Sequence, residues 1–395
     1  MTFNPVLSQI GTTIFTTMTH LALENQALNL GQGFPEEGWP DEMLEVAAHS
    51  LRHGDNQYPA MRGVAELRQA VADHDRRFYG LDYDYRTEII VTCGATEGLA
   101  AAILALLSPG DEVVVFEPHY DSYLPMIRLA GAIPRLVRLH PPDWAINPGA
   151  LRAAFNGKTR LIIFNTPMNP TGKIFSRADL TQIAELCQEF NVIAVCDEVY
   201  EHLVFAGAEH IPLASLPGMR DLSVRIGSAG KSFSLTGWKI GYLGGSAAVI
   251  EQIARAHQFL TFTIAPHLQH AVAWGLQQSP AWFAAMVEKL AAKRVKFVGG
   301  LSDRGIDVLP FQGGYFATID LHQFGMTESD ENFIHRMTVA GKLNAIPLSA
   351  FYAPPSLVEP GTYEPPPCHM VRFCFAKKDL SLDQGVEKLA RFLGK

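Results

Sequence analysis

A lysine between small residues is the feature of this sequence that most clearly can do chemistry. Lys231 lies in the stretch SAGKS, residues 228–232, directly after residues 222–227, which read as a β-strand. Two chemistries use such a lysine: a phosphate-binding loop, in which the ammonium group is a point charge, and an imine, in which the amine is a nucleophile. A plain surface lysine in a turn is the third interpretation.

The phosphate-loop interpretation fails at two points. Such a loop needs glycine five residues before its Gly-Lys-Ser triplet and a helix after it. Arg225 stands at the glycine position, and the residues after Lys231 include Gly237 and Gly241 and indicate a loop followed by a strand. A nucleotide-binding loop is therefore disfavoured. An imine-forming lysine and a surface lysine remain open, and the rest of the chain has to decide between them.

The composition indicates a large packed core. The chain has 395 residues, of which 48% are hydrophobic and 18% are charged, and its net charge is −8. This acidic balance argues against binding to nucleic acids or anionic membranes. The longest apolar run, residues 99–107, is too short to cross a bilayer, which takes about 20 residues.

The cysteines and histidines predict neither a disulfide framework nor a metal site. The five cysteines form no C-x-x-C pair, and the 14 histidines include no H-E-x-x-H spacing. The first five residues show no secretory signal. We therefore expect a reduced, cytoplasmic protein without a metal.

Apolar strands alternate with helices through the first half of the chain. Residues 88–92, 112–116, 160–164 and 191–196 read as strands, and residues 98–107, 123–130 and 177–190 read as helices. This alternation predicts an α/β fold with a mostly parallel sheet covered on both faces, and ligands bind beyond the carboxyl ends of such strands. After a long helix at 279–302 the pattern changes to that of a smaller α+β domain.

Several residues that follow these strands match the needs of pyridoxal phosphate chemistry. Lys231 can hold the cofactor aldehyde as an imine, and Asp197 can face the pyridine nitrogen, although a helix N-cap is the other interpretation of this aspartate. Tyr200 and Asn169 can donate to the phenolic oxygen. Arg372, in an otherwise apolar strand, suits capture of a substrate carboxylate.

The phosphate and the ring of the cofactor have candidates of their own. Backbone N–H groups at a helix start can bind phosphate, side chains near Lys231 can reach it, and an aromatic ring can stack on the pyridine. The candidates are Ala95, Thr96, Ser228 and Lys239 for the phosphate and Tyr120 for the ring. Each has a plain structural alternative when it is taken alone.

Taken together, these segments resemble the class I, fold-type I pyridoxal-phosphate-dependent aminotransferases. The resemblance runs from residue 10 to residue 393 and is closest to the branch of kynurenine aminotransferase, glutamine transaminase K and the bacterial methionine aminotransferases. It is carried by six segments in the family's order: residues 30–35, 56–58, 165–173, 197–200, 228–239 and 371–375.

The resemblance implies a fold, an activity and further site residues. It implies a seven-stranded, mostly parallel sheet in a large domain at 45–285, an N-terminal arm at 1–44 and a small domain at 286–395. It implies a homodimer with shared active sites, in which Tyr58 reaches the partner's cofactor phosphate and Phe262 reaches the partner's substrate pocket. Lys231, Asp197 and Tyr200 are the expected catalytic residues, and the expected substrate-binding residues are Gly33, Asn169, Arg372, Phe15, Phe262 and Tyr315.

The expected reaction moves the amino group of a methionine-, glutamine- or aromatic-type amino acid to a 2-oxo acid by ping-pong kinetics. In kynurenine-active members of the branch, an aromatic residue stands where this chain has Thr96 and a tryptophan where it has Phe15. These two differences favour methionine-like donors. A β-lyase acting on cysteine S-conjugates or cystathionine is the alternative within the same chemistry. A non-catalytic effector-sensing module is disfavoured, because no segment remains for a DNA-binding domain.

Overall fold

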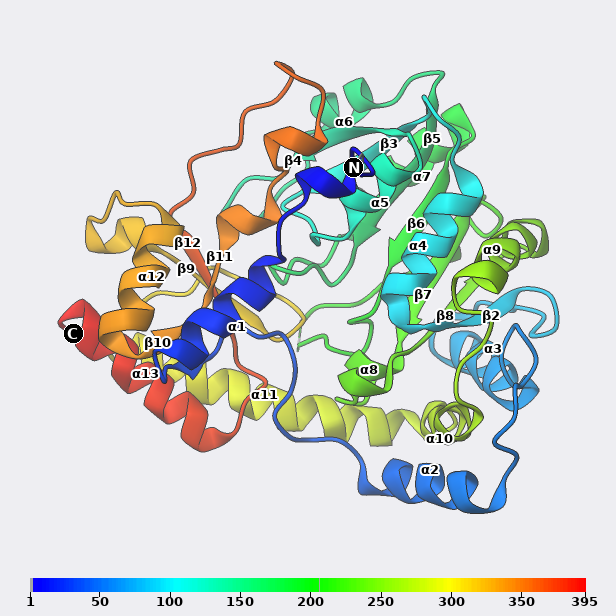
Figure 1. Ribbon diagram of the computed structural model, residues 1–395, viewed down its shortest axis with the longest axis horizontal. Helices are drawn as coiled ribbons and strands as arrows, with labels where there is room; N and C mark the ends of the chain where they lie inside the picture. The colour runs from blue at the N-terminus through cyan, green and yellow to red at the C-terminus, as the bar shows by residue number, and fades with distance from the viewer. Residues whose placement is uncertain (1–2, 206) are drawn as a thin grey trace.

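The computed structural model of the chain describes residues 3–205 and 207–395, and its largest feature is a twisted seven-stranded sheet (Figure 1). The strand order is β2-β8-β7-β6-β5-β3-β4, and only β8 runs antiparallel to its neighbours. The predicted mostly parallel, seven-stranded α/β fold is therefore confirmed. In sheet order the strands are β2 (Ile89–Cys93), β8 (Ile240–Gly245), β7 (Ser223–Ser228), β6 (Ile193–Asp197), β5 (Thr159–Asn165), β3 (Glu112–Glu117) and β4 (Ile133–Arg138).

Helices cover both faces of this sheet, which explains why its strands are apolar at almost every position. On β3, Val113 and Val115 pack into one core, and Val114 and Phe116 pack into the other. The helices of the first face are α4 (Gly94–Leu106), α5 (Tyr123–Leu129) and α9 (Ala247–Leu260), and those of the second are α6 (Pro148–Ala154) and α7 (Arg177–Phe190). A third group packs near β2: α2 (Asp41–His53), α3 (Ala65–Tyr79) and α10 (Pro266–Leu276).

The second part of the molecule is built around a three-stranded antiparallel sheet with its own core. Its strands are β11 (Ile346–Pro347), β12 (Met370–Cys374) and β9 (Phe316–Asp320), and its helices are α12 (Asp330–Gly341) and α13 (Asp379–Leu393). The N-terminal helix α1 (Ile14–Glu24) lies beside it, because β1 (Leu28–Asn29) pairs in parallel with β10 (Leu343–Asn344) (Figure 1).

One long helix, α11 (Pro280–Ser302), connects the two parts (Figure 1). The expected boundary at 285/286 falls inside this continuous helix. The division into an arm, a large domain and a small domain stays a prediction, and residues 1 and 2 of the expected arm lie outside the described residues. None of the described helices is long and apolar enough to span a membrane.

The element boundaries differ from the sequence prediction mainly around the glycines of residues 94–98. Helix α4 begins at Gly94 rather than at Gly98. Gly94 has a φ of 69°, which favours glycine, and the Glu97 carboxylate accepts from the backbone N–H of Cys93, so the first turn closes earlier than the run of small residues suggests. Strand β4 and helices α9 and α10 were not predicted at all.

Candidate active site

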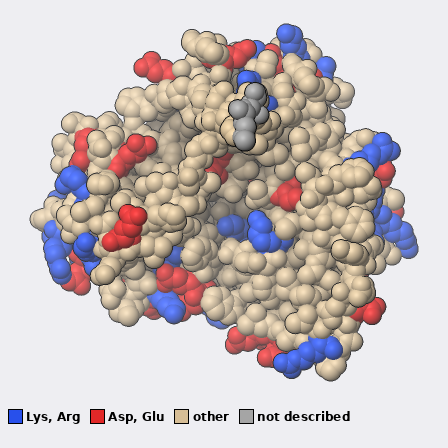
Figure 2. Space-filling model, in the orientation of Figure 1, with Lys and Arg blue, Asp and Glu red and all other residues tan. Residues whose placement is uncertain are grey.

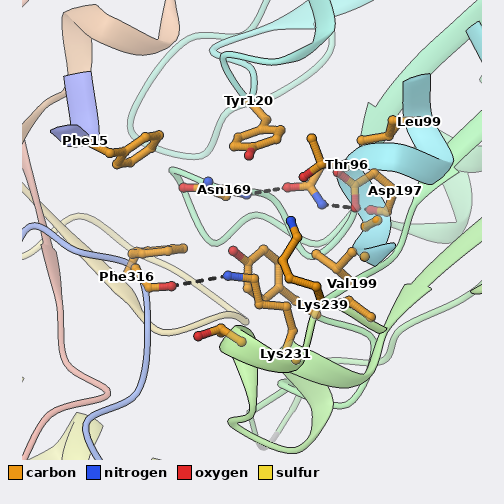
Figure 3. Close-up of a pocket in the computed structure, with 18 of the residues that line it drawn as sticks. Phe15, Thr96, Leu99, Tyr120, Asn169, Asp197, Val199, Lys231, Lys239 and Phe316 are labelled. Carbon is orange, nitrogen blue, oxygen red and sulfur yellow. Dashed lines mark hydrogen bonds between the residues drawn. The ribbon is translucent and has the colours of Figure 1, made fainter. Parts of the chain in front are cut away.

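The carboxyl ends of three neighbouring strands, β5, β6 and β7, meet at one edge of the large sheet, and a cavity of about 340 Å³ lies there, lined also by Phe316 and Arg372 of the small sheet (Figure 3). Asn165 and Asp197 end β5 and β6 as paired neighbours, and Ser228 ends β7. The cavity brings together twelve of the predicted site residues: Phe15, Gly33, Ala95, Thr96, Tyr120, Asn169, Asp197, Tyr200, Ser228, Lys231, Lys239 and Arg372. In the space-filling view, basic side chains lie inside the hollow at the centre of the face (Figure 2).

Lys231 points into this cavity from α8 (Ala229–Ser232), a single helical turn after β7 (Figure 3). Its Nζ donates to the carbonyl oxygen of Gly33 at 3.2 Å and to the hydroxyl of Tyr315 at 3.1 Å. Both acceptors are neutral. Burial lowers the pKa of Lys231 to about 8, and the positive charge of Arg372 acts in the same direction. The amine can therefore lose its proton near neutral pH, as a nucleophile or base requires.

Asp197 faces the cavity from the end of β6. Its Oδ2 accepts a hydrogen bond of 2.6 Å from the hydroxyl of Tyr123, and its Oδ1 is buried without a partner. Burial raises the pKa of Asp197 to about 6, against the effect of the hydrogen bond from Tyr123. The side chain of Asn165 donates to the backbone oxygen of Asp197 at 2.7 Å and fixes the two strand ends together.

Arg372 closes the cavity on the side of the small sheet, from the middle of β12. Its side chain is fully buried, donates to Asn169 Oδ1 and to the carbonyl of Gly31, each at 2.7 Å, and lies over the ring of Phe316 at 4.0 Å. Both acceptors are neutral, and Nε is buried without a partner. Burial lowers the pKa of Arg372 to about 10, so the guanidinium is still charged at neutral pH. A substrate carboxylate is the anion that this arrangement suits.

A cradle for an anion lies at the start of α4. The first N–H groups of a helix have no intrahelical acceptor, and the helix dipole favours negative charge there. A Cβ atom on Gly94 would lie only 3.3 Å from Lys239 Nζ, so glycine leaves room for the lysine over the helix start. Ala95, Thr96 and Ser228 line the same end of the cavity. This part of the site suits a phosphate group.

The remaining predicted aromatic residues lie in three places. Tyr120 and Tyr200 line the cavity, and Lys231 Nζ is 5.8 Å from the ring centre of Tyr200. Tyr315 lies behind Lys231, where its hydroxyl donates to the Gly33 carbonyl at 2.8 Å and its ring borders an adjoining hollow. Tyr58 and Phe262 lie outside the cavity and pack edge to face, with ring centres 5.8 Å apart.

Tyr123 and Phe316 are among the neighbours of the cavity that were not singled out from the sequence. Tyr123, which holds Asp197, stands 74 positions before it, and no spacing rule links the two. Phe316 follows Tyr315 at the start of β9, where an aromatic residue reads as ordinary core. Both rings are buried beside the polar residues of the cavity, and only this position distinguishes them from ordinary core residues.

The residues present fit pyridoxal phosphate. Asp197 lines the cavity, and its buried, unpartnered Oδ1 can accept from a protonated pyridine nitrogen. Gly94 leaves the space beside Lys239 that a phosphate needs. We therefore expect Lys231 and Asp197 to hold opposite ends of the ring, with the start of α4 on the phosphate.

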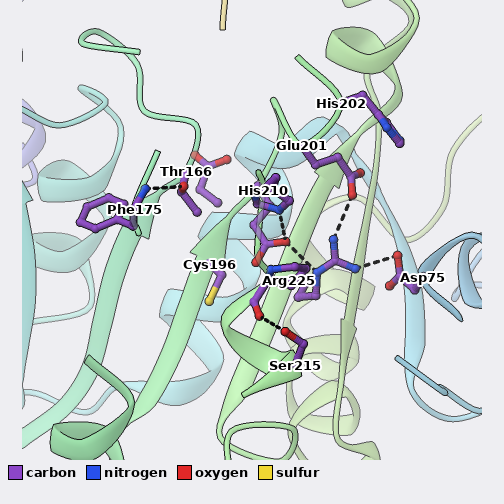
Figure 4. Close-up of polar contacts among 12 residues, drawn as sticks. Asp75, Thr166, Phe175, Cys196, Glu201, His202, His210, Ser215 and Arg225 are labelled. Atoms are coloured by element: carbon purple, nitrogen blue, oxygen red, sulfur yellow. Dashed lines mark hydrogen bonds and ion pairs between the residues drawn. The ribbon is translucent and has the colours of Figure 1, made fainter. Parts of the chain in front are cut away.

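A second set of charged residues involves residues 197–201, the segment that also contributes Asp197 and Tyr200 to the cavity (Figure 4). The Arg225 guanidinium contacts Asp75 at 2.7 Å, Glu198 at 2.7 Å and Glu201 at 2.9 Å. We call Arg225 and these three carboxylates the Arg225 network. His74, Glu201 and His202 also place potential metal ligands within 4.8 Å of one another. However, Glu201 is bound by Arg225, and the two imidazoles hydrogen-bond each other at 2.7 Å, so we assign no metal to them.

Known aminotransferases are similar to this chain over almost its whole length. The family description "Aminotransferase class I and II" matches residues 25–389. A probable N-succinyldiaminopimelate aminotransferase of Mycobacterium tuberculosis is 42% identical over 386 residues, which cover 97% of each chain. Methionine aminotransferase of Escherichia coli is 38% identical, covering 98% of this chain and 99% of its own. Kynurenine–oxoglutarate transaminase 3 of Rattus norvegicus is 37% identical, covering 95% of this chain and 87% of its own.

Solved structures agree with the sequences. The N-succinyldiaminopimelate aminotransferase of Mycobacterium tuberculosis superposes with a TM-score of 0.92 at 40% identity, and the Escherichia coli methionine aminotransferase with 0.92 at 37%. Each match covers 99% of this chain and 100% of the other. The chain therefore belongs to the class I and II aminotransferases, a pyridoxal-phosphate-dependent family, and has the fold-type I architecture of that family.

Proposed function

We propose that this aminotransferase takes its amino group from neutral amino acids of the methionine, glutamine or aromatic type and delivers it to a 2-oxo acid by ping-pong kinetics. The observation that carries the proposal is the distribution of positive charge. The cationic side chains that line the described cavity are Lys231, Lys239 and Arg372. Each has a task that does not involve the substrate's side chain, so no described cation is left for a second carboxylate.

The walls near Arg372 support a neutral donor. Phe15 and Phe316 lie against the guanidinium, at 5.5 Å and 4.0 Å from its centre, and both line the cavity (Figure 3). A thioether or an aromatic ring gains dispersion energy against such surfaces. A distal carboxylate would lose its hydration there without an ionic partner.

In the proposed mechanism, pyridoxal phosphate supplies an electron sink for the charge that develops at the substrate's α-carbon. Arg372 and Asn169 bind the substrate's α-carboxylate and orient the α-carbon toward Lys231. The Nζ of Lys231 takes the proton from the α-carbon of the amino donor. In the second half of the reaction it gives a proton to the α-carbon derived from the 2-oxo acid, and its lowered pKa suits both steps. Asp197 supplies the negative charge that keeps the ring nitrogen protonated, and Tyr200 is a donor to the ring's oxygen.

We also propose that two copies of the chain share their active sites. Tyr58 and Phe262 form part of an exposed apolar patch with Phe259 and Leu260, and the side chains of Tyr58 and Phe259 are each 84% exposed. Such a patch favours burial against another protein surface. In a dimer, Tyr58 would approach the partner's phosphate cradle and Phe262 the partner's substrate pocket.

The test is a steady-state comparison of amino donors with a panel of 2-oxo acids. Methionine, glutamine, phenylalanine, leucine and kynurenine represent neutral donors, and aspartate, glutamate and N-succinyl-LL-diaminopimelate represent donors with a distal carboxylate. We expect kcat/KM for the best neutral donor to exceed that for every acidic donor by at least about 100-fold. Preference for an acidic donor would overturn the proposal.

The β-lyase alternative finds no specific support in the described pocket, and the relatives named above are aminotransferases. The same assays decide it. Release of pyruvate and ammonia from a cysteine thioether without any 2-oxo acid would favour the lyase reaction. Formation of product only when a 2-oxo acid is present is the result that we expect.

A further inference from the structure

Within the described part of the chain, the hydroxyl of Tyr123 is the side-chain group that hydrogen-bonds the carboxylate of Asp197. Tyr123 is the first residue of α5, its side chain is 1% exposed, and its hydroxyl donates to Asp197 Oδ2 at 2.6 Å. The other oxygen, Oδ1, is buried and has no hydrogen-bond partner. The two oxygens of one carboxylate therefore have different surroundings, one held by the protein and one left for a ligand.

We infer that Tyr123 is a positioning residue for the cofactor: its hydroxyl holds Oδ2 of Asp197, so that Oδ1 is ionised and directed at the ring nitrogen. The inference rests on the proposed contact between Asp197 and that nitrogen. The inference adds to that proposed contact a cause: Tyr123, a residue placed outside contact with cofactor and substrate, sets the orientation and the charge of the Asp197 carboxylate.

The surroundings of Tyr123 leave its hydroxyl little freedom. Its ring packs edge to face on Tyr120 at 5.8 Å and parallel to His119 at 6.2 Å. His119 Nδ1 lies 2.9 Å from the carbonyl of Tyr120, so this nitrogen is the donor and the imidazole is fixed in place. Burial raises the pKa of Tyr123 well above its usual value. The phenol therefore stays protonated and acts only as a donor toward Asp197.

A donor of this kind favours the ionised carboxylate. Burial and the charge of Glu198 disfavour ionisation of Asp197, whereas the Tyr123 hydroxyl, the backbone N–H of Val199 and the charge of Lys231 favour it. Removal of the Tyr123 hydroxyl would shift this balance toward the protonated acid. A protonated Asp197 has no negative charge to offer to a pyridinium, so the cofactor would bind less tightly, and more so at lower pH.

The experiment compares Tyr123→Phe with Tyr83→Phe in the full-length chain freed of cofactor. Tyr83 is a matched control, because its hydroxyl is also buried but has no hydrogen-bond partner. Pyridoxal phosphate and its analogue with carbon in place of the ring nitrogen are titrated at pH 6 and pH 8, with binding followed by absorbance. We expect Tyr123→Phe to weaken pyridoxal phosphate binding by about 10- to 100-fold at pH 6 and by less at pH 8.

The carbon analogue separates positioning from a loss of packing. We expect its affinity to be the same in the wild type and in Tyr123→Phe, because it has no nitrogen for Asp197 to face. An equal loss for both ligands, or a loss independent of pH, would overturn the inference. Equal binding of the two ligands by the wild type would instead overturn the proposed role of Asp197 itself.

A second variant covers the possibility that Tyr123→Phe does not fold. Placing 3-fluorotyrosine at position 123 keeps the ring and the hydroxyl but makes the hydroxyl a stronger donor. We expect this substitution to tighten pyridoxal phosphate binding at pH 6 relative to the wild type. Weaker or unchanged binding at pH 6 would contradict the inference.

Discussion

The cavity around Lys231 and the Arg225 network lie on opposite sides of one segment, residues 197–201. Asp197 and Tyr200 line the cavity, whereas Glu198 and Glu201 bind Arg225 on the other side (Figures 3 and 4). Both regions hold buried cations and carboxylates. They differ in how these charges are paired, and that difference separates the part of the molecule that does chemistry from the part that holds it in place.

In the Arg225 network, every carboxylate has a cationic partner. Burial by itself lowers the pKa of Arg225, but Asp75, Glu198 and Glu201 outweigh it and raise the pKa well above its usual value. In the cavity, Lys231 and Arg372 donate only to neutral oxygens, and burial lowers the pKa of both. Cations without anions are costly to bury, and a cofactor or substrate anion removes that cost.

The largest effect that we expect on the cavity side comes from Lys231→Ala. Removal of the amine takes away the group that moves the α-proton, and we expect turnover of methionine with a 2-oxo acid to fall by at least about 1,000-fold. Lys296→Ala is the control, because Lys296 pairs with Asp383 at 2.9 Å on the surface and should keep its turnover. A Lys231→Ala enzyme with near-normal turnover would rule out the assigned role.

On the network side, Arg225→Met should reduce stability rather than turnover per folded molecule. The substitution leaves three buried carboxylates without their cation, and we expect the free energy of unfolding to fall by about 3–5 kcal/mol. Urea denaturation at one protein concentration measures this loss. Arg372→Met is the matched variant, since it also replaces a buried arginine but removes no ion pair. If both variants lost the same stability, the distinction between the two regions would fail.

Activity should rank the same two variants in the opposite order. Arg372→Met removes the proposed partner of the substrate's α-carboxylate, and we expect kcat/KM for methionine to fall by about 100-fold. Folded Arg225→Met enzyme, assayed below its denaturation temperature, should lose much less. The result to watch for is an Arg372→Met enzyme with an unchanged KM, which would show that the carboxylate binds elsewhere.

The sequence was sufficient for those parts of the site that follow from strand ends. Asp197, Asn169 and Lys231 could be predicted to lie together, because each follows an apolar strand of one parallel sheet. Arg372 could be predicted from a single charge in an apolar strand. The resemblance to the aminotransferases then assigned them roles that no spacing rule gives.

Other features of the site depend on contacts between elements that are far apart in the sequence, and residue patterns along the chain do not predict such contacts. The contact between Tyr123 and Asp197 depends on where α5 comes to rest beside β6. The Arg225 network joins α3, the end of β6 and β7, and Arg225 was read in the sequence only as a failed glycine position. Tyr58 and Phe262 lie apart from the cavity of their own chain, so their proposed roles need a second copy.

The smallest expected effect is the sharpest test of the difference between the cavity and the Arg225 network, because it is a gain in stability. Lys231→Met removes a buried cation whose hydrogen-bond acceptors are both neutral, and we expect the cofactor-free protein to become more stable at pH 7, by about 1–3 kcal/mol. The pKa of Lys231 is about 8 in the folded chain and 10.5 without its surroundings. Between these values the unfolded chain binds more protons, so the stability of the wild type rises with pH there.

The advantage of Lys231→Met should therefore be full below pH 8 and shrink as the pH approaches 10.5. Urea midpoints of the cofactor-free proteins at pH 7 and pH 10 measure the change. Lys296→Met, at a surface ion pair, should show no such pH-dependent gain. A Lys231→Met protein less stable than the wild type at pH 7 would mean that the lysine is favourably paired, as Arg225 is. The cavity would then not hold the uncompensated positive charge on which the proposed binding of cofactor and substrate depends.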